Sequence, residues 1–217
     1  MPWRLLPTTG AASAVPSVVH PIKHYSSVNG RLHGPCPAAN VAHVRATPEP
    51  STSTDFSVRP ATAADWPGMW AVVEPVIRAG ETFTWDRDTT EEAARQRWFK
   101  EAPGQAFVAV TSDGRVIGTG ELHPNQGGAG SHVANAGYMA HSNHGGKGVA
   151  RALCNYSLEA ARAAGFRAMQ FNAVVESNVR AVAAWKAMGF EVLATIPEAF
   201  DHPSLGYVGL HVMYRKL

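Results

Sequence analysis

The sequence predicts one mixed α/β domain, a central sheet with helices, preceded by a long N-terminal extension. Three observations support this fold class. Strand-like and helix-like hydrophobic periods alternate from Phe56 onward, turn signals separate them, and 45% of the 217 residues are hydrophobic. That length and composition are sufficient for one core. This composition and the net charge of +2 are typical of a soluble globular protein.

The first half of the domain is predicted to contain a strand, two helices and three further strands. Phe56, Val58 and Pro60 indicate the first strand. Thr62 and Thr89 each precede an acidic residue by three positions, the signal of a helix N-terminus. We expect Pro67 and Pro75 to shorten or kink the first of these helices. The three strands are expected at residues 105–110, 115–123 and 132–140, the first two joined by a hairpin turn.

The second half is predicted to contain a helix, a strand, a helix and two strands, in that order. The expected ranges are 148–164, 168–174, 179–188, 190–196 and 207–214. In the first helix, apolar and small residues recur at i, i+3 and i+4 from Ala150 to Ala161, which predicts a face packed on the sheet. Gly165 is expected to end it.

Residues 1–54 differ in composition from the rest of the chain. They hold eight of the 15 prolines, four Lys or Arg, and one acid, Glu49. No helical or strand period is present, so we predict a disordered extension. Two interpretations stay open, an organelle-targeting leader and a dispensable extension. We otherwise expect a cytoplasmic protein.

Composition and motifs also argue against several function classes. A net charge of +2 does not indicate a nucleic-acid partner, and no stretch is long and apolar enough for a membrane span. Cys36 and Cys154 are too far apart in sequence to form a metal-ligand motif, and His141 and His144 have no thiolate or carboxylate beside them. We therefore predict no metal site, and no covalent catalysis because Cys154 lies on a packing face.

The most informative segment runs from residue 144 to residue 150. Gly145, Gly146 and Gly148 separate a predicted strand from a predicted helix. Glycines at such a turn let backbone N–H groups converge on an anion, and the helix N-terminus adds partial positive charge. The spacing matches neither the Walker A loop nor Gly-x-Gly-x-x-Gly. Taken alone, the turn could equally serve tight packing.

At this point the chain resembles the GCN5-related N-acetyltransferase (GNAT) family, over about residues 56–217. Gly148 and Ala150 match the end of that family's Gln/Arg-x-x-Gly-x-Gly/Ala loop, with Gly145 in place of the Gln or Arg. The motif Asn-x-x-Ala…Gly-Phe is matched by Asn178, Ala181 and residues 189–190. The resemblance implies a mostly antiparallel sheet and acetyl-CoA as co-substrate. It implies these cofactor-binding residues: Met139, Ala140, Gly145, Gly146, Lys147, Gly148, Val149, Ala150, Asn178 and Trp185.

A narrower resemblance points to the fungal N-acetyltransferases that act on proline analogues such as azetidine-2-carboxylate. It rests on residues 135–138, Phe171 with Asn172, and Asn178 with Trp185. Asn135 and Asn172 each interrupt an apolar strand, and amides in central strands need partners. Because an amide both donates and accepts, the pair could hold a substrate carboxylate and present its amine, and we predict both as catalytic and substrate-binding. The alternative is that each amide caps a backbone bulge.

The acceptor side is predicted around the loop at residues 80–85. Glu81, Phe83, Trp85 and Tyr138 are expected to contact the substrate, although Phe83 and Trp85 could simply anchor the loop. A base must deprotonate the amine, and the open candidates are Glu81, which we prefer, Glu121, His123, His132 and Glu176. The general acid stays unassigned, because Trp185 stands where many relatives carry a Tyr.

The sequence thus predicts an acetyl-CoA-dependent N-acetyltransferase that transfers acetyl directly to a small amine, with an amino acid or proline analogue as the favoured acceptor. Within the same class, an antibiotic or herbicide amine and a peptide N-terminus are alternatives. From another class, the alternative is an acyl-CoA-binding regulatory or interaction module without turnover. A homodimer is compatible with the sequence, whereas nucleic-acid and membrane partners are not expected.

Overall fold

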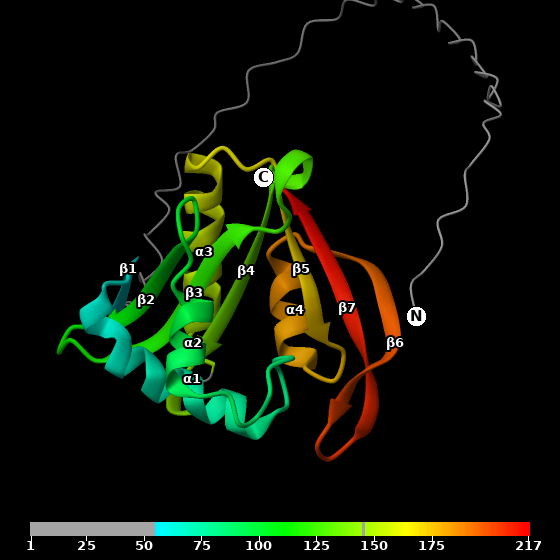
Figure 1. The fold of residues 1–217 in the computed structure, drawn as a ribbon, viewed down its shortest axis with the longest axis horizontal. Helices are drawn as coiled ribbons and strands as arrows, with labels where there is room; N and C mark the ends of the chain where they lie inside the picture. The colour runs from blue at the N-terminus through cyan, green and yellow to red at the C-terminus, as the bar shows by residue number, and fades with distance from the viewer. Residues whose placement is uncertain (1–54, 145) are drawn as a thin grey trace, which may run out of the picture. The chain divides into compact units, whose positions relative to one another are not determined.

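The computed structural model describes residues 55–144 and 146–217, so the predicted extension at 1–54 and Gly145 lie outside the described residues. A seven-stranded sheet forms the centre, in the order β1-β2-β3-β4-β5-β7-β6 (Figure 1). The strands are β1 Phe56–Pro60, β2 Gln105–Thr111, β3 Val116–Pro124, β4 Val133–Ala140, β5 Ala168–Val175, β6 Glu191–His202 and β7 Gly206–Lys216. The helices are α1 Trp66–Ala79, α2 Glu91–Trp98, α3 Val149–Ala163 and α4 Val179–Ala187. Among the described strands, β4 and β5 form the single parallel pair.

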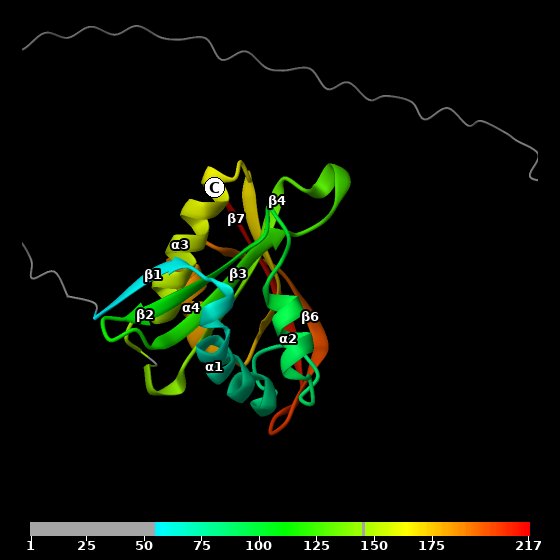
Figure 2. The same cartoon turned by 60° about the vertical axis from the view of Figure 1, so that its left-hand side comes forward.

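Alternation along β2 explains why helices cover both faces of the sheet. Phe107 and Ala109 belong to a core cluster with side chains of α3 and α4, such as Leu153. Ala106 and Val108 belong to a second cluster with side chains of α1 and α2. Because successive strand residues point to opposite faces, the two helix pairs lie on opposite sides of the sheet (Figures 1 and 2).

The predicted mixed, mostly antiparallel sheet with flanking helices is confirmed, and its elements lie near the predicted ranges, with three local corrections. The strand predicted at 190–196 runs six residues further, as β6 from Glu191 to His202. α1 is not shortened: it runs for 14 residues through Pro75, and Pro67 sits in its first turn, where a missing N–H costs nothing. α2 is capped by Thr90, whose Oγ1 accepts from the Ala93 N–H at 3.3 Å. The predicted cap, Thr89, instead donates its hydroxyl to the Asp86 carbonyl at 2.6 Å.

The pairing of β4 with β5 is confined to one end of the two strands. Val133 pairs with Ala168 and Ala134 with Met169, and no further pair is present among these described residues. Beyond that point β4 stays paired with β3 as far as Ala140, while β5 continues along β7. The two strands therefore separate toward their carboxyl ends.

Candidate active site

A cavity of about 480 Å³ lies where β4 and β5 separate. Residues 135–140 of β4 and 171–175 of β5 form two of its walls, and residues 82–85 of the loop between α1 and α2 form a third. Its size is within the range of small-molecule sites, which is about 300–1,000 Å³. The predicted cofactor and acceptor residues Asn135, Tyr138, Met139, Ala140, Ala150, Asn172, Asn178, Trp185, Phe83 and Trp85 all line it.

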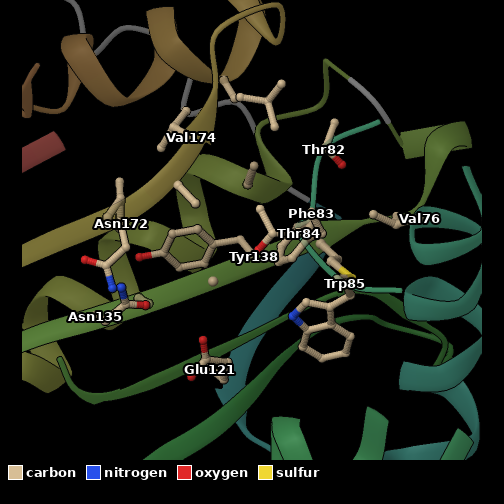
Figure 3. Close-up of a pocket in the computed structure, with 18 of the residues that line it drawn as sticks. Val76, Thr82, Phe83, Thr84, Trp85, Glu121, Asn135, Tyr138, Asn172 and Val174 are labelled. Carbon is tan, nitrogen blue, oxygen red and sulfur yellow. The ribbon is translucent and has the colours of Figure 1, made fainter. Parts of the chain in front are cut away.

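The two predicted amides face each other across this opening (Figure 3). They share one acceptor: Asn125 Oδ1 accepts from Asn172 Nδ2 at 2.6 Å and from Asn135 Nδ2 at 3.4 Å. Asn172 Oδ1 in turn accepts from Gln170 Nε2 at 2.8 Å. The side-chain partners of both amides are thus other amides. If each amide capped a backbone bulge, its side chain would bond to a backbone group, and no bond of that kind is present among the described residues. The pairing of β5 with β7 does shift register between Phe171 and Val174.

Asn125 was not singled out by the sequence. It directly follows β3, and its backbone N–H donates to the Val133 carbonyl at 2.8 Å. This bond holds Asn125 beside the start of β4, from which its side chain reaches both strands of the opening. The one sequence signal is its position after Pro124 in a polar, glycine-rich turn, and such turns are usually solvated.

Aromatic side chains form the acceptor-side wall. Phe83, Trp85 and Trp98 pack with ring centroids 5.9 to 6.5 Å apart, and the Arg97 guanidinium lies 5.2 Å from the centre of the Trp85 ring. Phe83 and Trp85 thus both line the cavity and anchor the loop. Glu81 in the same loop is exposed and is not part of the cavity wall.

Tyr138 lies against Trp185 on the inner side of the cavity, with ring centroids 5.3 Å apart. Its hydroxyl donates to Ser157 Oγ at 2.6 Å, because Ser157 itself donates to the Cys154 carbonyl at 2.8 Å. Burial, with a smaller contribution from Cys154, raises the pKa of Tyr138 well above its ordinary value. The phenol proton of Tyr138 is therefore engaged in a hydrogen bond within the core.

The candidates for the general base differ in whether they line the cavity. Glu121 and His123 line the cavity, and Glu121 Oε2 is 2.8 Å from His123 Nδ1. His132 and Glu176 do not line it. His132 is exposed with Nδ1 3.1 Å from the Ala129 carbonyl, and Glu176 accepts from the Gly209 N–H at 3.1 Å.

The last residues of the turn between β4 and α3, Gly146 to Gly148, have features of an anion cradle. Gly146 and Gly148 both have φ of +81°, and Gly148 is the N-cap of α3, with no side-chain cap and no acid in the first turn of that described helix. The first N–H groups of α3 are thus left for another acceptor. A Cβ atom added to Gly146 would lie 3.6 Å from Arg180 Nη2, so a guanidinium from α4 flanks the turn together with Lys147. The turn therefore fits the diphosphate of a coenzyme A ester.

The predicted cofactor residues fall into two groups around this turn. Gly146, Lys147 and Gly148 line a second hollow on the surface beside the turn, whereas the Val149 side chain is buried beneath it. Asn178 lines the main cavity and also caps α4, since its Oδ1 accepts from the Ala181 N–H at 3.2 Å. Arg180 was not anticipated, because the sequence alone does not bring the start of α4 to this turn.

No three His, Cys, Asp or Glu side chains of residues 55–144 and 146–217 are grouped so as to hold a metal ion. None of the helices in this part of the chain is long and apolar enough to cross a membrane.

The sequence profile of the Acetyltransferase (GNAT) family matches residues 70–190, which is more than half of the chain. The chain belongs to this family. The family predicted from the glycine turn and the Asn178 motif is therefore confirmed.

Solved structures of GNAT proteins have the same fold. The structure of a GCN5-related N-acetyltransferase from Kribbella flavida is 46% identical, with a TM-score of 0.73, over 75% of this chain and 98% of that one. A GNAT superfamily phosphinothricin acetyltransferase from Sinorhizobium meliloti, solved in complex with AcCoA, is 20% identical, with a TM-score of 0.68, over 75% and 89% of the two chains. At this lower identity the likeness shows the fold alone.

A curated relative is N-acetyltransferase aca1 of Schizosaccharomyces pombe, which is 27% identical over 137 residues. The match spans 57% of this chain and 66% of the relative, slightly less than two thirds of its length.

Proposed function

We propose that the chain is an acetyl-CoA-dependent N-acetyltransferase that transfers acetyl directly to the amine of a small molecule. The favoured acceptor is an amino acid or a proline-like imino acid. Family membership supports the reaction class. The observation that carries the acceptor class is the pair of amides, Asn135 and Asn172, on opposite walls of the cavity and bound to one shared acceptor.

Acetyl-CoA is supported by the turn before α3 and by the Sinorhizobium meliloti relative, whose structure contains AcCoA. Gly146, Gly148, Lys147 and Arg180 would hold the diphosphate of the coenzyme. The pantetheine arm would lie in the opening between β4 and β5, beside Met139 and Ala140. Bound there, the coenzyme supplies an acetyl group as a thioester.

The protein's own contribution is to hold the amine and to stabilise developing negative charge. Past Ala134, the N–H groups of β4 that face β5 have no strand partner among the described residues, so they can donate to an oxyanion. The amides of Asn135 and Asn172 can bind a carboxylate without changing their own charge. The aromatic wall of Phe83, Trp85 and Trp98 limits the acceptor to a compact molecule, which disfavours a peptide N-terminus.

The test is thiol release from acetyl-CoA with a panel of amines. Azetidine-2-carboxylate is compared with azetidine, which lacks the carboxylate, and with phosphinothricin and a short peptide. Replacement Asn172→Ala is expected to lower kcat/KM for the preferred amino acid by about 10- to 100-fold, since a hydrogen bond to a charged group contributes about 1.5–3 kcal/mol. Affinity for acetyl-CoA should stay unchanged.

Gln96→Ala is the matched control, because it removes an amide that is exposed on α2 and bonded to Glu92 at 2.8 Å. Thiol release that is equal with azetidine and with its 2-carboxylate would refute the acceptor class. Tight binding of acetyl-CoA without release by any amine would favour the binding-module alternative instead.

A further inference from the structure

Glu121 and His123 on β3 are polar residues of the cavity wall that the proposed function does not use. Glu121 is a charged residue that is only 8% exposed, yet it lines the cavity. Its carboxylate extends into the space between Asn135 and Trp85 (Figure 3). A buried carboxylate is costly unless it has partners, so its place in a ligand cavity calls for an explanation.

The two oxygens of this carboxylate have different surroundings. Oε2 accepts from the His123 ring N–H, at 2.8 Å from Nδ1, which holds the carboxylate in one orientation. Oε1 faces β4 at Gly137, the residue paired with Glu121 across the two strands. A Cβ atom added to Gly137 would lie 3.0 Å from Oε1 and 3.6 Å from Phe83 Cε1. The glycine therefore leaves Oε1 open to the cavity on the side of the aromatic wall.

Charged and titratable groups reach this space from several elements. His123 lies on β3 itself, Tyr138 on β4 and Arg97 on α2, and Lys100 follows that helix. The negative charge of Glu121 is one of the causes that raise the pKa of Tyr138, after burial and Cys154. Arg97 is stacked on Trp85, and both Arg97 and Lys100 are exposed. Within the described part of the chain, Glu121 is the acid of the cavity wall.

We propose that Glu121 is the general base of the reaction, accepting the acceptor's ammonium proton on Oε1, and that His123 is a positioning residue that orients the carboxylate. The inference rests on the proposed function. It replaces Glu81, the carboxylate preferred from the sequence, because Glu81 is exposed and outside the cavity wall.

The protons balance as follows for an amine that enters as an ammonium. One N–H proton passes to Glu121 Oε1, and the nitrogen lone pair forms the C–N bond with the acetyl carbon. A second proton leaves the nitrogen and joins the sulfur as the C–S bond breaks. The products are the amide, the free thiol and one proton, which Glu121 returns to water after the products leave.

The test compares Glu121→Gln with the wild-type protein over a range of pH. General-base catalysis contributes about 10²- to 10⁴-fold, so kcat/KM for an alkyl amine should fall at least about 100-fold near pH 7. The variant can use only the free amine, whose fraction rises tenfold for each pH unit below the amine's pKa. For the variant, the logarithm of kcat/KM plotted against pH should therefore rise with a slope of one over that range. For the wild-type protein, the same plot should be flat where the carboxylate is ionised.

The acceptor's basicity gives a second readout, which a merely structural role would not move. With a fluorinated analogue of the same acceptor, whose nitrogen is already neutral at the assay pH, Glu121→Gln should lose less than about threefold. Glu121→Asp keeps a carboxylate and should restore part of the flat profile. Glu159→Gln removes an exposed carboxylate on α3 and serves as the matched control, with calorimetric acetyl-CoA affinity and thermal unfolding measured for each variant.

Equal losses with both acceptors, or a Glu121→Gln profile that parallels the wild type, would overturn the assignment of the base while leaving the proposed function intact. Absence of thiol release by the wild-type protein with every amine would overturn the proposed function and this inference with it.

Discussion

Gly148 offers the sharpest test of the coenzyme turn. It is the N-cap of α3 and has φ of +81° and ψ of 3°, a left-handed conformation that costs an ordinary L-residue about 1–2 kcal/mol. A Cβ atom added at Gly148 meets no heavy atom within 4 Å. The replacement Gly148→Ala thus adds backbone strain without a steric clash inside the protein.

The expected loss of acetyl-CoA affinity follows from that strain. If the turn relaxes, binding must restore the strained conformation, which costs about 1–2 kcal/mol and lowers affinity by about 5- to 30-fold. If the turn does not relax, the methyl group occupies the open space assigned to the diphosphate. Both routes weaken binding, which isothermal titration calorimetry with acetyl-CoA measures directly.

Gly165 provides the matched control at the other end of the same helix. It has φ of +84°, and an added Cβ atom again meets nothing within 4 Å. Gly165→Ala should therefore destabilise the protein by a similar amount, and each kcal/mol should lower Tm by about 2–4 °C. Its affinity for acetyl-CoA should match the wild type. Equal affinities for the two variants, with both Tm values lowered, would refute the assignment of the turn.

Three further outcomes are expected. Asn125→Ala removes the acceptor shared by the two cavity amides and should lower kcat/KM for the acceptor about tenfold, without changing the calorimetric affinity for acetyl-CoA; an unchanged kcat/KM would contradict the bridging role. Burial raises the pKa of the Cys154 thiol to about 12, so alkylation at pH 8, followed by peptide mass spectrometry, should be roughly a thousandfold slower than for a free thiol; labelling at the free-thiol rate would show an accessible thiolate. Bonding to Arg59 lowers the pKa of Asp65, so this pair contributes stability that is lost as pH falls below about 4; Tm of Arg59→Gln should depend less on pH in that range, and a parallel profile would argue against the pair.

Most of the fold could be predicted because its signals are local. In β2, alternation over residues 105–110 already separates the two faces that α1 with α2 and α3 with α4 cover. The correction at α2 is also local in origin. Both Thr89 and Thr90 can act as N-caps, and the sequence pattern favoured Thr89. In the structure the Thr89 hydroxyl donates to the Asp86 carbonyl, and Thr90 is the cap. A hydrogen bond of that kind depends on the path of the preceding loop, which the sequence does not specify.

The site could be predicted only where one strand or turn contains the signal. Asn135, Asn172 and the glycine turn stood out because each breaks the pattern of its own segment. Asn125 and Arg180 did not, because their roles arise from segments that meet only in the folded chain. For the same reason the sequence favoured Glu81 among the base candidates, although it is Glu121 that lines the cavity. Glu121 differs from Glu81 and Glu176 by its pairing with Gly137, and strand register is a non-local property.

The two edges of β4 explain how a rigid sheet can contain an open site. On one edge, β4 is paired with β3 from Ala134 to Ala140, which fixes the positions of Asn135, Gly137 and Tyr138. On the other edge, its pairing with β5 ends after Ala134, so the remaining backbone groups need water or a ligand as partner. The same strand end leads into the turn that begins α3, and the open edge and the anion cradle are therefore consecutive in the chain. The proposed coenzyme, in which an amide-containing arm adjoins a diphosphate, would meet the open edge and the turn in the order in which the chain presents them.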